Sequence, residues 1–221
     1  MCVRNNWYWL SKGTLTLDYQ DTTGCPAKAF PADRLYFEPI LKAMHYLRIN
    51  RPGNVPSDIS HWKSRTMMLS WLVSGYISWL MFSRPATEIL VQSADEVRAV
   101  EIVDNCKILW TNSSDTLRAK WKVDKDPSNQ PYNRFFLANG SAMTGIPGGA
   151  NKVRSYHPTV YVADEAAIMV DLEDCESNAR ATRCHQLIKI SSANVGYMHD
   201  QFTACEEVDW PGEWEEFDYA A

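Results

Sequence analysis

The sequence lacks the cysteine spacing of a zinc site. Its six cysteines are scattered, with no CxxC pair and no two histidines placed three to five residues apart to complete a metal site. This pattern favours free thiols in a reducing compartment. The first ten residues also lack the apolar core of a secretion signal. We therefore expect a cytoplasmic protein.

An excess of positive charge is missing as well. The net charge of −5 argues against a protein that coats nucleic acid through a broad basic surface, because phosphate neutralisation needs clustered Lys and Arg. Any contact with DNA should be local or transient. No internal repeat or low-complexity tract is present, and 221 residues with 45% hydrophobic composition suit one large α/β domain.

One long uncharged run, Thr66 to Ser83, lies between Arg65 and Arg84. Such a run is compatible with a membrane helix. It also carries a serine at every fourth position from Ser70, which places a small hydroxylated stripe along one helical face. A helix sandwiched inside a soluble domain, with one side close to a sheet, explains both features, and we prefer this interpretation.

The rest of the chain alternates between strand and helix patterns. A helix is expected around 35–47, a strand over 89–92, and a helix to about 109 opened by a capping box of Ser93 and Glu96. Residues 111–133 are expected to form a loop or irregular insertion. A hairpin closed by the Asn139–Gly140 pair follows, and strands are expected over 159–163 and 187–190. This order predicts a mostly parallel sheet flanked by helices, with its ligand crevice at the carboxyl edge.

Two acids end the apolar segment VYVADEAA, residues 160–167. In nucleotide hydrolases such a strand lets the first carboxylate hold Mg²⁺ while the second orients and deprotonates the attacking water. Asp164 would hold the metal and Glu165 would be the base. A strand that simply ends in solvated acids is the alternative.

A second segment, KSRTMMLSW from Lys63 to Trp71, has the parts of a phosphate loop. Such a loop combines backbone N–H groups at a helix N-terminus, a cation for the phosphates and a hydroxyl for Mg²⁺. Lys63 or Arg65 could supply the cation and Ser70 the hydroxyl. The common pattern GxxxxGK[ST] is violated, so a basic turn before a buried helix remains the alternative.

Five elements in order over residues 63–194 resemble the ATPase part of phage terminase large subunits. They are KSRTMMLSW, ILVQSADEVRAVEIV, NGSAMTGIPGGANKVRSYHPT, VYVADEAA and ISSAN. The resemblance implies an ASCE-type P-loop NTPase that binds ATP and Mg²⁺. It also implies a deviant phosphate loop (Walker A) and an acidic strand (Walker B).

The same resemblance assigns roles to individual positions. The phosphate loop would be Lys63, Ser64, Arg65, Thr66, Met67, Met68, Leu69 and Ser70; the metal ligands Ser70 and Asp164; the catalytic groups Glu165 and, as an arginine finger, Arg154; and the coupling segment Ser191, Ser192 and Asn194. Arg154 could instead be a surface or loop-anchoring arginine, and the coupling serines a turn after a strand. Met68 stands where most of the family has glycine, and a Cβ there can forbid the dihedral the loop requires. The segment before the loop is a poor buried strand, so that strand is expected to be short or displaced.

The implied function is ATP-driven translocation of double-stranded DNA into a capsid. The expected partners are a portal protein and a small terminase subunit, with a homo-oligomeric ring on the procapsid, no membrane, and a location in the host cell cytoplasm. Residues 1–52 would be a helical or irregular lead-in, 53–204 the ATPase core, and 205–221 an acidic tail or a linker towards a nuclease domain. Nuclease activity is not expected from this chain.

Two competing interpretations follow. The first is a truncated or catalytically weak terminase-like module that binds DNA or partners without efficient hydrolysis. The second is a helicase of the DEAD-like kind, which shares the acidic strand, although no second arginine-bearing core follows it here.

Overall fold

A computed structural model describes residues 5–17, 27–31, 34, 36–50, 53, 55–64, 67–192 and 196–203, with side chains to residue 201. Its centre is a six-stranded sheet in the order β3-β8-β7-β4-β6-β5. Neighbouring strands are parallel except β5, which runs antiparallel to β6. The strands are β3 (Ser57–Lys63), β4 (Glu88–Ser93), β5 (Arg134–Phe136), β6 (Ala142–Pro147), β7 (Val160–Asp164) and β8 (Gln186–Ser192). A separate antiparallel pair joins β1 (Leu15–Leu17) to β2 (Ala27–Ala29).

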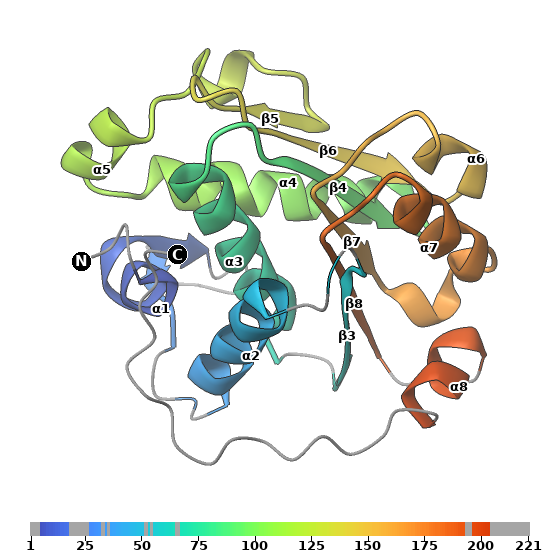
Figure 1. The fold of residues 1–221 in the computed structure, drawn as a ribbon. Coiled ribbons are helices and arrows are strands. Elements are labelled where there is room, and N and C mark those ends of the chain that lie inside the picture. The colour runs from blue at the N-terminus through green and yellow to red at the C-terminus, as the bar shows by residue number, and fades with distance from the viewer. Residues whose placement is uncertain are drawn as a thin grey trace.

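Helices cover both faces of this sheet (Figure 1). One face carries α2 (Phe37–Ile49), α3 (Leu69–Ser83) and α4 (Glu96–Thr111), and the other carries α6 (Ala150–Val153), α7 (Leu172–Ala181) and α8 (Tyr197–Thr203). Shorter helical segments are α1 (Asn6–Tyr8), a π-helical turn at Trp9–Gly13, α5 (Asp115–Lys120), and 3₁₀ turns at Pro127–Asn129 and Ala166–Ile168. The expected α/β architecture, a mostly parallel central sheet flanked by helices, is confirmed.

The alternation of side chains along each strand builds two separate cores. Ile89 and Val91 of β4 join the apolar cluster under α3 and α4, whereas Leu90 between them joins the cluster under α6 and α7. In β7, Val162 and Tyr161 divide in the same way. Successive residues of a strand point to opposite faces, so an uninterrupted apolar run is what a strand covered on both sides requires.

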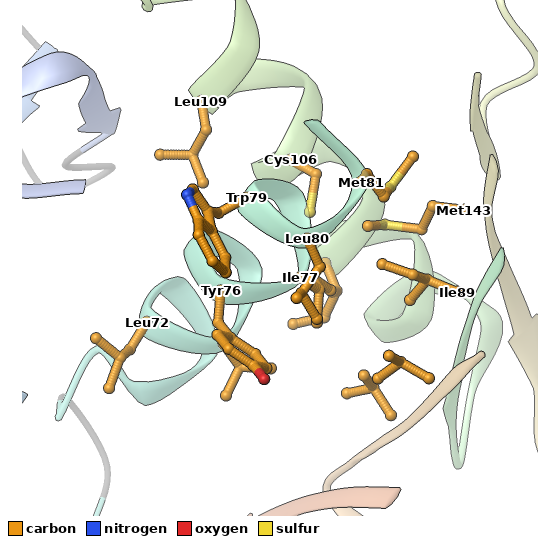
Figure 2. Close-up of a cluster of buried hydrophobic side chains, with 14 of the residues drawn as sticks. Leu72, Tyr76, Ile77, Trp79, Leu80, Met81, Ile89, Cys106, Leu109 and Met143 are labelled. Carbon is orange, nitrogen blue, oxygen red and sulfur yellow. The ribbon is translucent and has the colours of Figure 1, made fainter. Parts of the chain in front are cut away.

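Helix α3 lies inside the first core. Every residue except Ser70 and Ser83 is buried, which explains a sequence that is apolar all round. Figure 2 shows Ile77, Leu80 and Met81 gathered with Ile89 and Met143. Within the described residues, none of the helices has both the length and the apolar character needed to cross a membrane.

One side of α3 lies close to the sheet, as expected, and its small face packs against α4. The Cys106 thiol of α4 lies 3.5 Å from the carbonyl oxygen of Ser74. The Ser74 hydroxyl donates to the carbonyl of Ser70 over 2.7 Å. Small residues let two helices approach closely. Gly75 likewise lets Leu10 of the π-helical turn pack closely against α3, because an added Cβ would lie 2.7 Å from the Leu10 side chain.

Residues of the N-terminal lead-in share this core. Trp9, Leu10, Phe30 and Phe37 are buried in the same cluster as α3. The indole ring of Trp9 packs edge-on against Phe82, with ring centroids 5.5 Å apart. Three of the six cysteines, Cys106, Cys175 and Cys184, are buried. Cys2, Cys25, Cys205 and the whole of 205–221 lie outside the described residues.

Several local expectations need correction. Ser93 is the last residue of β4, and Asp95 caps α4 instead, its carboxylate accepting the Arg98 N–H over 2.9 Å. The segment 111–133 contains the helix α5 within its loops. The region before the phosphate loop forms β3, a regular seven-residue strand paired along its length with β8.

The hairpin between β5 and β6 exists, but it is not closed by a two-residue turn. Leu137 N–H donates to the Ser141 carbonyl over 2.9 Å, and Gly140 is the residue of the Asn139–Gly140 pair that has positive φ, 83°. Asn139 has another task, because its amide donates to the carbonyl of Met81 over 2.8 Å and ties the hairpin to α3.

Candidate functional site

Four strands bring polar residues to the carboxyl edge of the sheet, which we call the site edge. β3 ends at Lys63, β8 at Ser192, β7 at Asp164 and β4 at Ser93. Lys63 is paired in register with Ser192, and Ser93 with Asp164. Parallel strands end together at one edge, so residues far apart in the sequence are neighbours here.

Asp164 and Ser70 meet at this edge. The Ser70 hydroxyl, in the first turn of α3, lies 3.5 Å from Oδ1 of Asp164. Asp164 is only 7% exposed, and burial raises the pKa of its carboxyl from 3.8 to about 6, with Lys63 lowering it and Glu165 raising it further. Burial penalises the charged form, so this carboxylate is held where a cation would stabilise it.

Glu165 has a partner on each of its carboxylate oxygens. Oε1 lies 3.4 Å from the Lys63 ammonium and 3.7 Å from the Arg98 guanidinium. Oε2 lies 3.4 Å from the Ser191 hydroxyl and 3.5 Å from the Ser192 backbone nitrogen. The backbone of Glu165 is left-handed, φ 50° and ψ 42°. For a residue with a Cβ this conformation costs about 1–2 kcal/mol, and strain of this kind gathers at functional sites.

The predicted phosphate loop lies beside the two acids. Ser64 follows β3, and its N–H points to the sulfur of Met67 over 3.3 Å. Leu69 begins α3, and among the described residues no side chain caps that end of the helix. Uncapped N–H groups at the start of a long helix are suited to bind an anion. Arg65 and Thr66 lie outside the described residues.

Met68 does adopt the conformation expected to be forbidden to it. It stands at the N-cap of α3 with φ 55° and ψ 22°, in the left-handed region. A Cβ therefore makes this dihedral costly without excluding it. The Cβ of methionine does not forbid a left-handed backbone at this position.

Arg154 lies apart from these contacts. It is exposed, at the end of α6, and its Nε donates to the side-chain oxygen of Asn178 on α7 over 3.0 Å. The amide of Asn178 in turn donates to the carbonyl of Ala150 over 3.0 Å. The structure therefore supports a loop-anchoring contact for Arg154, and its role as an arginine finger stays a prediction.

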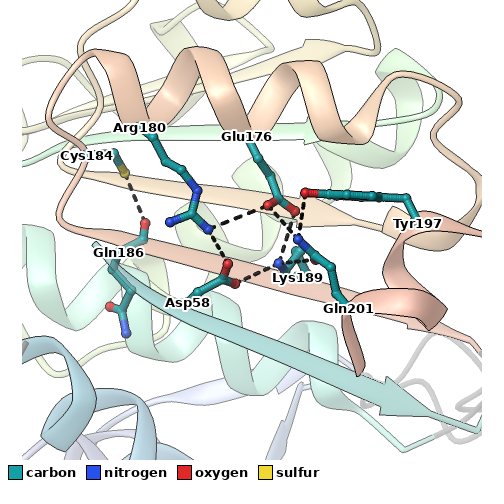
Figure 3. Close-up of polar contacts among 8 residues, drawn as sticks. All are labelled: Asp58, Glu176, Arg180, Cys184, Gln186, Lys189, Tyr197 and Gln201. Carbon is teal, nitrogen blue, oxygen red and sulfur yellow. Dashed lines mark hydrogen bonds and ion pairs between the residues drawn. The ribbon is translucent and has the colours of Figure 1, made fainter. Parts of the chain in front are cut away.

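Ser191 and Ser192 of the predicted coupling segment are the last two residues of β8, so they do not form a turn after the strand. Ser191 is buried and, with Ser192, contacts Glu165, whereas Asn194 lies outside the described residues. Two residues before Ser191, the buried Lys189 ammonium lies 2.7 Å from Asp58 on β3, 3.0 Å from Glu176 on α7 and 2.6 Å from Gln201 on α8 (Figure 3). β8 is thereby tied to a strand and two helices immediately next to the site.

Two site residues escaped the sequence reasoning. Arg98 lies in the first turn of α4 and contacts Glu165. The sequence signal for it was an arginine three residues after Asp95, which caps a helix that follows a strand of the sheet. Ser93 is fully buried opposite Asp164, and its hydroxyl has no hydrogen-bond partner among the described residues. The two residues flank the β4–α4 connection, where the sequence pattern predicted only a helix-capping role for Ser93.

The oxygen atoms at the site edge fit a hard divalent cation. Ser70 and Asp164 offer a hydroxyl and a carboxylate oxygen, the ligand types that Mg²⁺ prefers. Across the described part of the chain, no group of three or more His, Cys, Asp and Glu side chains could hold a metal ion. A Mg²⁺ ion with few protein ligands, completed by phosphate and water, agrees with this donor set.

Together these features define a class. One strand, β8, lies between β3, which leads into the predicted phosphate loop, and β7, which leads to the acidic pair. A strand, a loop and a long helix, with an acid pair beside the start of that helix, are the features of a P-loop NTPase, and this chain has that fold.

Comparison with solved structures finds similar chains among phage large terminases. The large terminase of bacteriophage HK97 matches with a TM-score of 0.57 at 12% identity, over 86% of this chain and 37% of that one. The large terminase ATPase domain of Thermus phage P74-26 matches with a TM-score of 0.46 at 15% identity, over 80% and 72% of the two chains. A large terminase from a thermophilic bacteriophage, solved in complex with ADP, matches with a TM-score of 0.42 at 15% identity, over 69% and 37%.

No protein-family model matches the sequence, and no curated protein matches it either. The likeness to the HK97 large terminase shows that the chain has a terminase large-subunit ATPase-like fold. The chain spans little more than a third of the length of that protein.

Proposed function

We propose that this chain is the ATPase subunit of a viral DNA-packaging terminase, coupling Mg²⁺-dependent ATP hydrolysis to the movement of double-stranded DNA. The observation that carries the proposal is the meeting of two segments distant in the sequence: Ser70 lies 3.5 Å from Asp164, and Lys63 lies 3.4 Å from Glu165. The fold shared with large terminases supports the same conclusion.

Each group at the site edge has a chemical task. The N–H groups at the start of α3, with Lys63, would bind the β- and γ-phosphates. Ser70 and Asp164 would hold Mg²⁺, which when bound neutralises charge on the phosphate oxygens. Glu165 would orient a water molecule and accept its proton as the water oxygen attacks the γ-phosphorus and the bond to the bridging oxygen breaks, giving ADP and phosphate.

Ser191 and Ser192 contact Glu165 directly. A movement of the Glu165 side chain on loss of the γ-phosphate would therefore first displace the end of β8. Because Lys189 joins β8 to α7 and α8, that change has a path to the helices on the far face of the sheet. We propose that this path couples hydrolysis to movement of DNA. The proposal includes a ring of subunits on a portal protein, with a small terminase subunit as partner.

Two observations favour a second function. Glu165 is contacted by two cations and Met68 is strained, which are also properties of a module that binds partners but hydrolyses little ATP. ATP hydrolysis by the purified chain, with and without double-stranded DNA and Mg²⁺, separates the two.

For the ATPase we expect Mg²⁺-dependent turnover that Glu165→Gln reduces at least about 100-fold. Lys63→Ala should weaken nucleotide binding. Glu173→Gln, an exposed acid in the first turn of α7, is the matched control and should leave turnover unchanged. Turnover that is absent in every condition, or equal in the wild type and Glu165→Gln, would support the binding module instead.

A further inference from the structure

Arg98 forms a bridge between the start of α4 and Glu165. Its Nε lies 3.2 Å from Asp95 Oδ2, and its Nη1 lies 3.7 Å from Glu165 Oε1. Asp95 is itself fixed, because its other carboxylate oxygen accepts the Arg98 N–H over 2.9 Å and caps the helix. The guanidinium is therefore anchored to the first turn of a helix whose opposite face is buried in the core.

Glu165 shares one oxygen between two cations that differ in their surroundings. Lys63 ends β3 and is the first residue of the predicted phosphate loop, so it is the cation that a bound triphosphate would attract. Arg98 starts from a different strand and helix and has Asp95 as its own counter-ion. If Lys63 turns towards phosphate, Arg98 is the cation that remains on Oε1.

We infer that Arg98 is a positioning residue that keeps the Glu165 carboxylate aimed at the attacking water while Lys63 is engaged by nucleotide. This inference rests on the proposed ATPase function. An ordinary surface ion pair would contribute little, since the Arg98 side chain is 47% exposed. The contact differs from such a pair because the Glu165 side chain is only 17% exposed and sits on a strained backbone that its side-chain partners must hold.

The planar guanidinium suits this bridge better than an ammonium would. Its N–H groups point in fixed, divergent directions, so one can face Asp95 while another faces Glu165. Lysine at this position would keep the positive charge but could not direct separate N–H groups to Asp95 and Glu165 in this fixed geometry. We therefore expect Arg98→Lys to recover only part of the function of Arg98.

The test separates binding from chemistry in the full chain. Nucleotide affinity is measured with a fluorescent ATP analogue, and hydrolysis is measured in single turnover with Mg²⁺. Arg98→Ala should lower the hydrolysis rate about 10- to 100-fold, the range expected when a catalytic group is misplaced by about 1 Å, with affinity within about 3-fold of the wild type. Added guanidinium ion should restore part of the rate.

Two further variants sharpen the result. Asp95→Asn keeps a good helix cap but removes the counter-ion that anchors Arg98, so a smaller loss of a few-fold is expected. Arg118→Ala removes an arginine in the same arrangement, three residues after Asp115 at the start of α5, and should leave hydrolysis unchanged. In a Glu165→Gln background, Arg98→Ala should produce no further loss, because the group through which it acts is already removed.

Hydrolysis by Arg98→Ala within 2-fold of the wild type would overturn the inference and leave the ATPase proposal standing. So would a rate loss matched by an equal loss of nucleotide affinity, or a further loss in the Glu165→Gln background. Absence of hydrolysis by the wild type would overturn the proposed function, and the role of Arg98 with it.

Discussion

Met68 occupies a left-handed backbone conformation, φ 55° and ψ 22°, at the N-terminus of α3. For a residue with a Cβ, this conformation costs about 1–2 kcal/mol, whereas glycine adopts it freely. Glycine loses about 0.5–1 kcal/mol more conformational free energy on folding than alanine. We therefore expect Met68→Gly to be more stable than Met68→Ala by about 0.5–1 kcal/mol, the reverse of the usual order in helices.

The methionine side chain contributes separately. It is half-buried against the core, so its removal in either variant should cost about 1 kcal/mol of apolar burial. Met68→Gly should therefore have nearly the stability of the wild type, and Met68→Ala should be about 1 kcal/mol less stable. In a chain of 221 residues this corresponds to a melting temperature about 2–4 °C lower.

Urea denaturation of the nucleotide-free variants is the assay, with two controls in the same chain. Arg183 has φ 62°, so glycine should again be favoured over alanine there. Val97 is an exposed residue within α4, and there glycine should be less stable than alanine by about 1 kcal/mol. A Met68→Ala variant as stable as Met68→Gly would refute the reasoning.

Three more outcomes follow from buried charges. Burial raises the Asp164 pKa to about 6, so Asp164→Asn should stabilise the nucleotide-free protein by about 1–3 kcal/mol at pH 7. This gain in the free energy of unfolding should develop as the pH rises from about 4 to 6, because over that range Asp164 ionises in the unfolded state before it ionises in the native state. Urea denaturation of both proteins at pH 4 and pH 7 tests it. Lys189→Met should lower the free energy of unfolding by about 3–5 kcal/mol, because it leaves Asp58 and Glu176 without this cation. A melting temperature near that of the wild type would contradict this. Burial, then Arg48, lowers the His45 pKa from 6.5 to about 4. The free energy of unfolding should therefore fall by roughly 3 kcal/mol as the pH drops from about 6.5 to 4, because the unfolded state binds the proton more readily. His45→Gln should remove that loss when unfolding is followed over the same pH range.

The β4–α4 connection shows why part of the site could not be predicted. Ser93 and Arg98 look like strand-end and helix-start residues, and local patterns specify no more than that. They became site residues because β4 pairs with β7, which places Ser93 opposite Asp164 and α4 beside Glu165. Strand order depends on contacts between distant segments, whereas periodicity reports only the local surroundings of each residue.

The sequence by itself determined the layered α/β architecture and the placing of Asp164 and Glu165 at a strand end. A strand buried on both faces must be apolar throughout, and its first polar residues must come where it leaves the core. Ser70 was likewise identifiable, as the hydroxyl opening an apolar helix. These features could be predicted from the sequence because each depends on the residues of a single segment of the chain.

Only the tertiary structure decided which of these residues meet. It brought Ser70 to Asp164 and Lys63 to Glu165, turned Arg154 towards Asn178, and showed that Met68 tolerates a left-handed backbone. Such contacts are set by strand register and by the packing of helices on the sheet. The free energy of that packing is shared among many residues, so no single motif in the sequence encodes it.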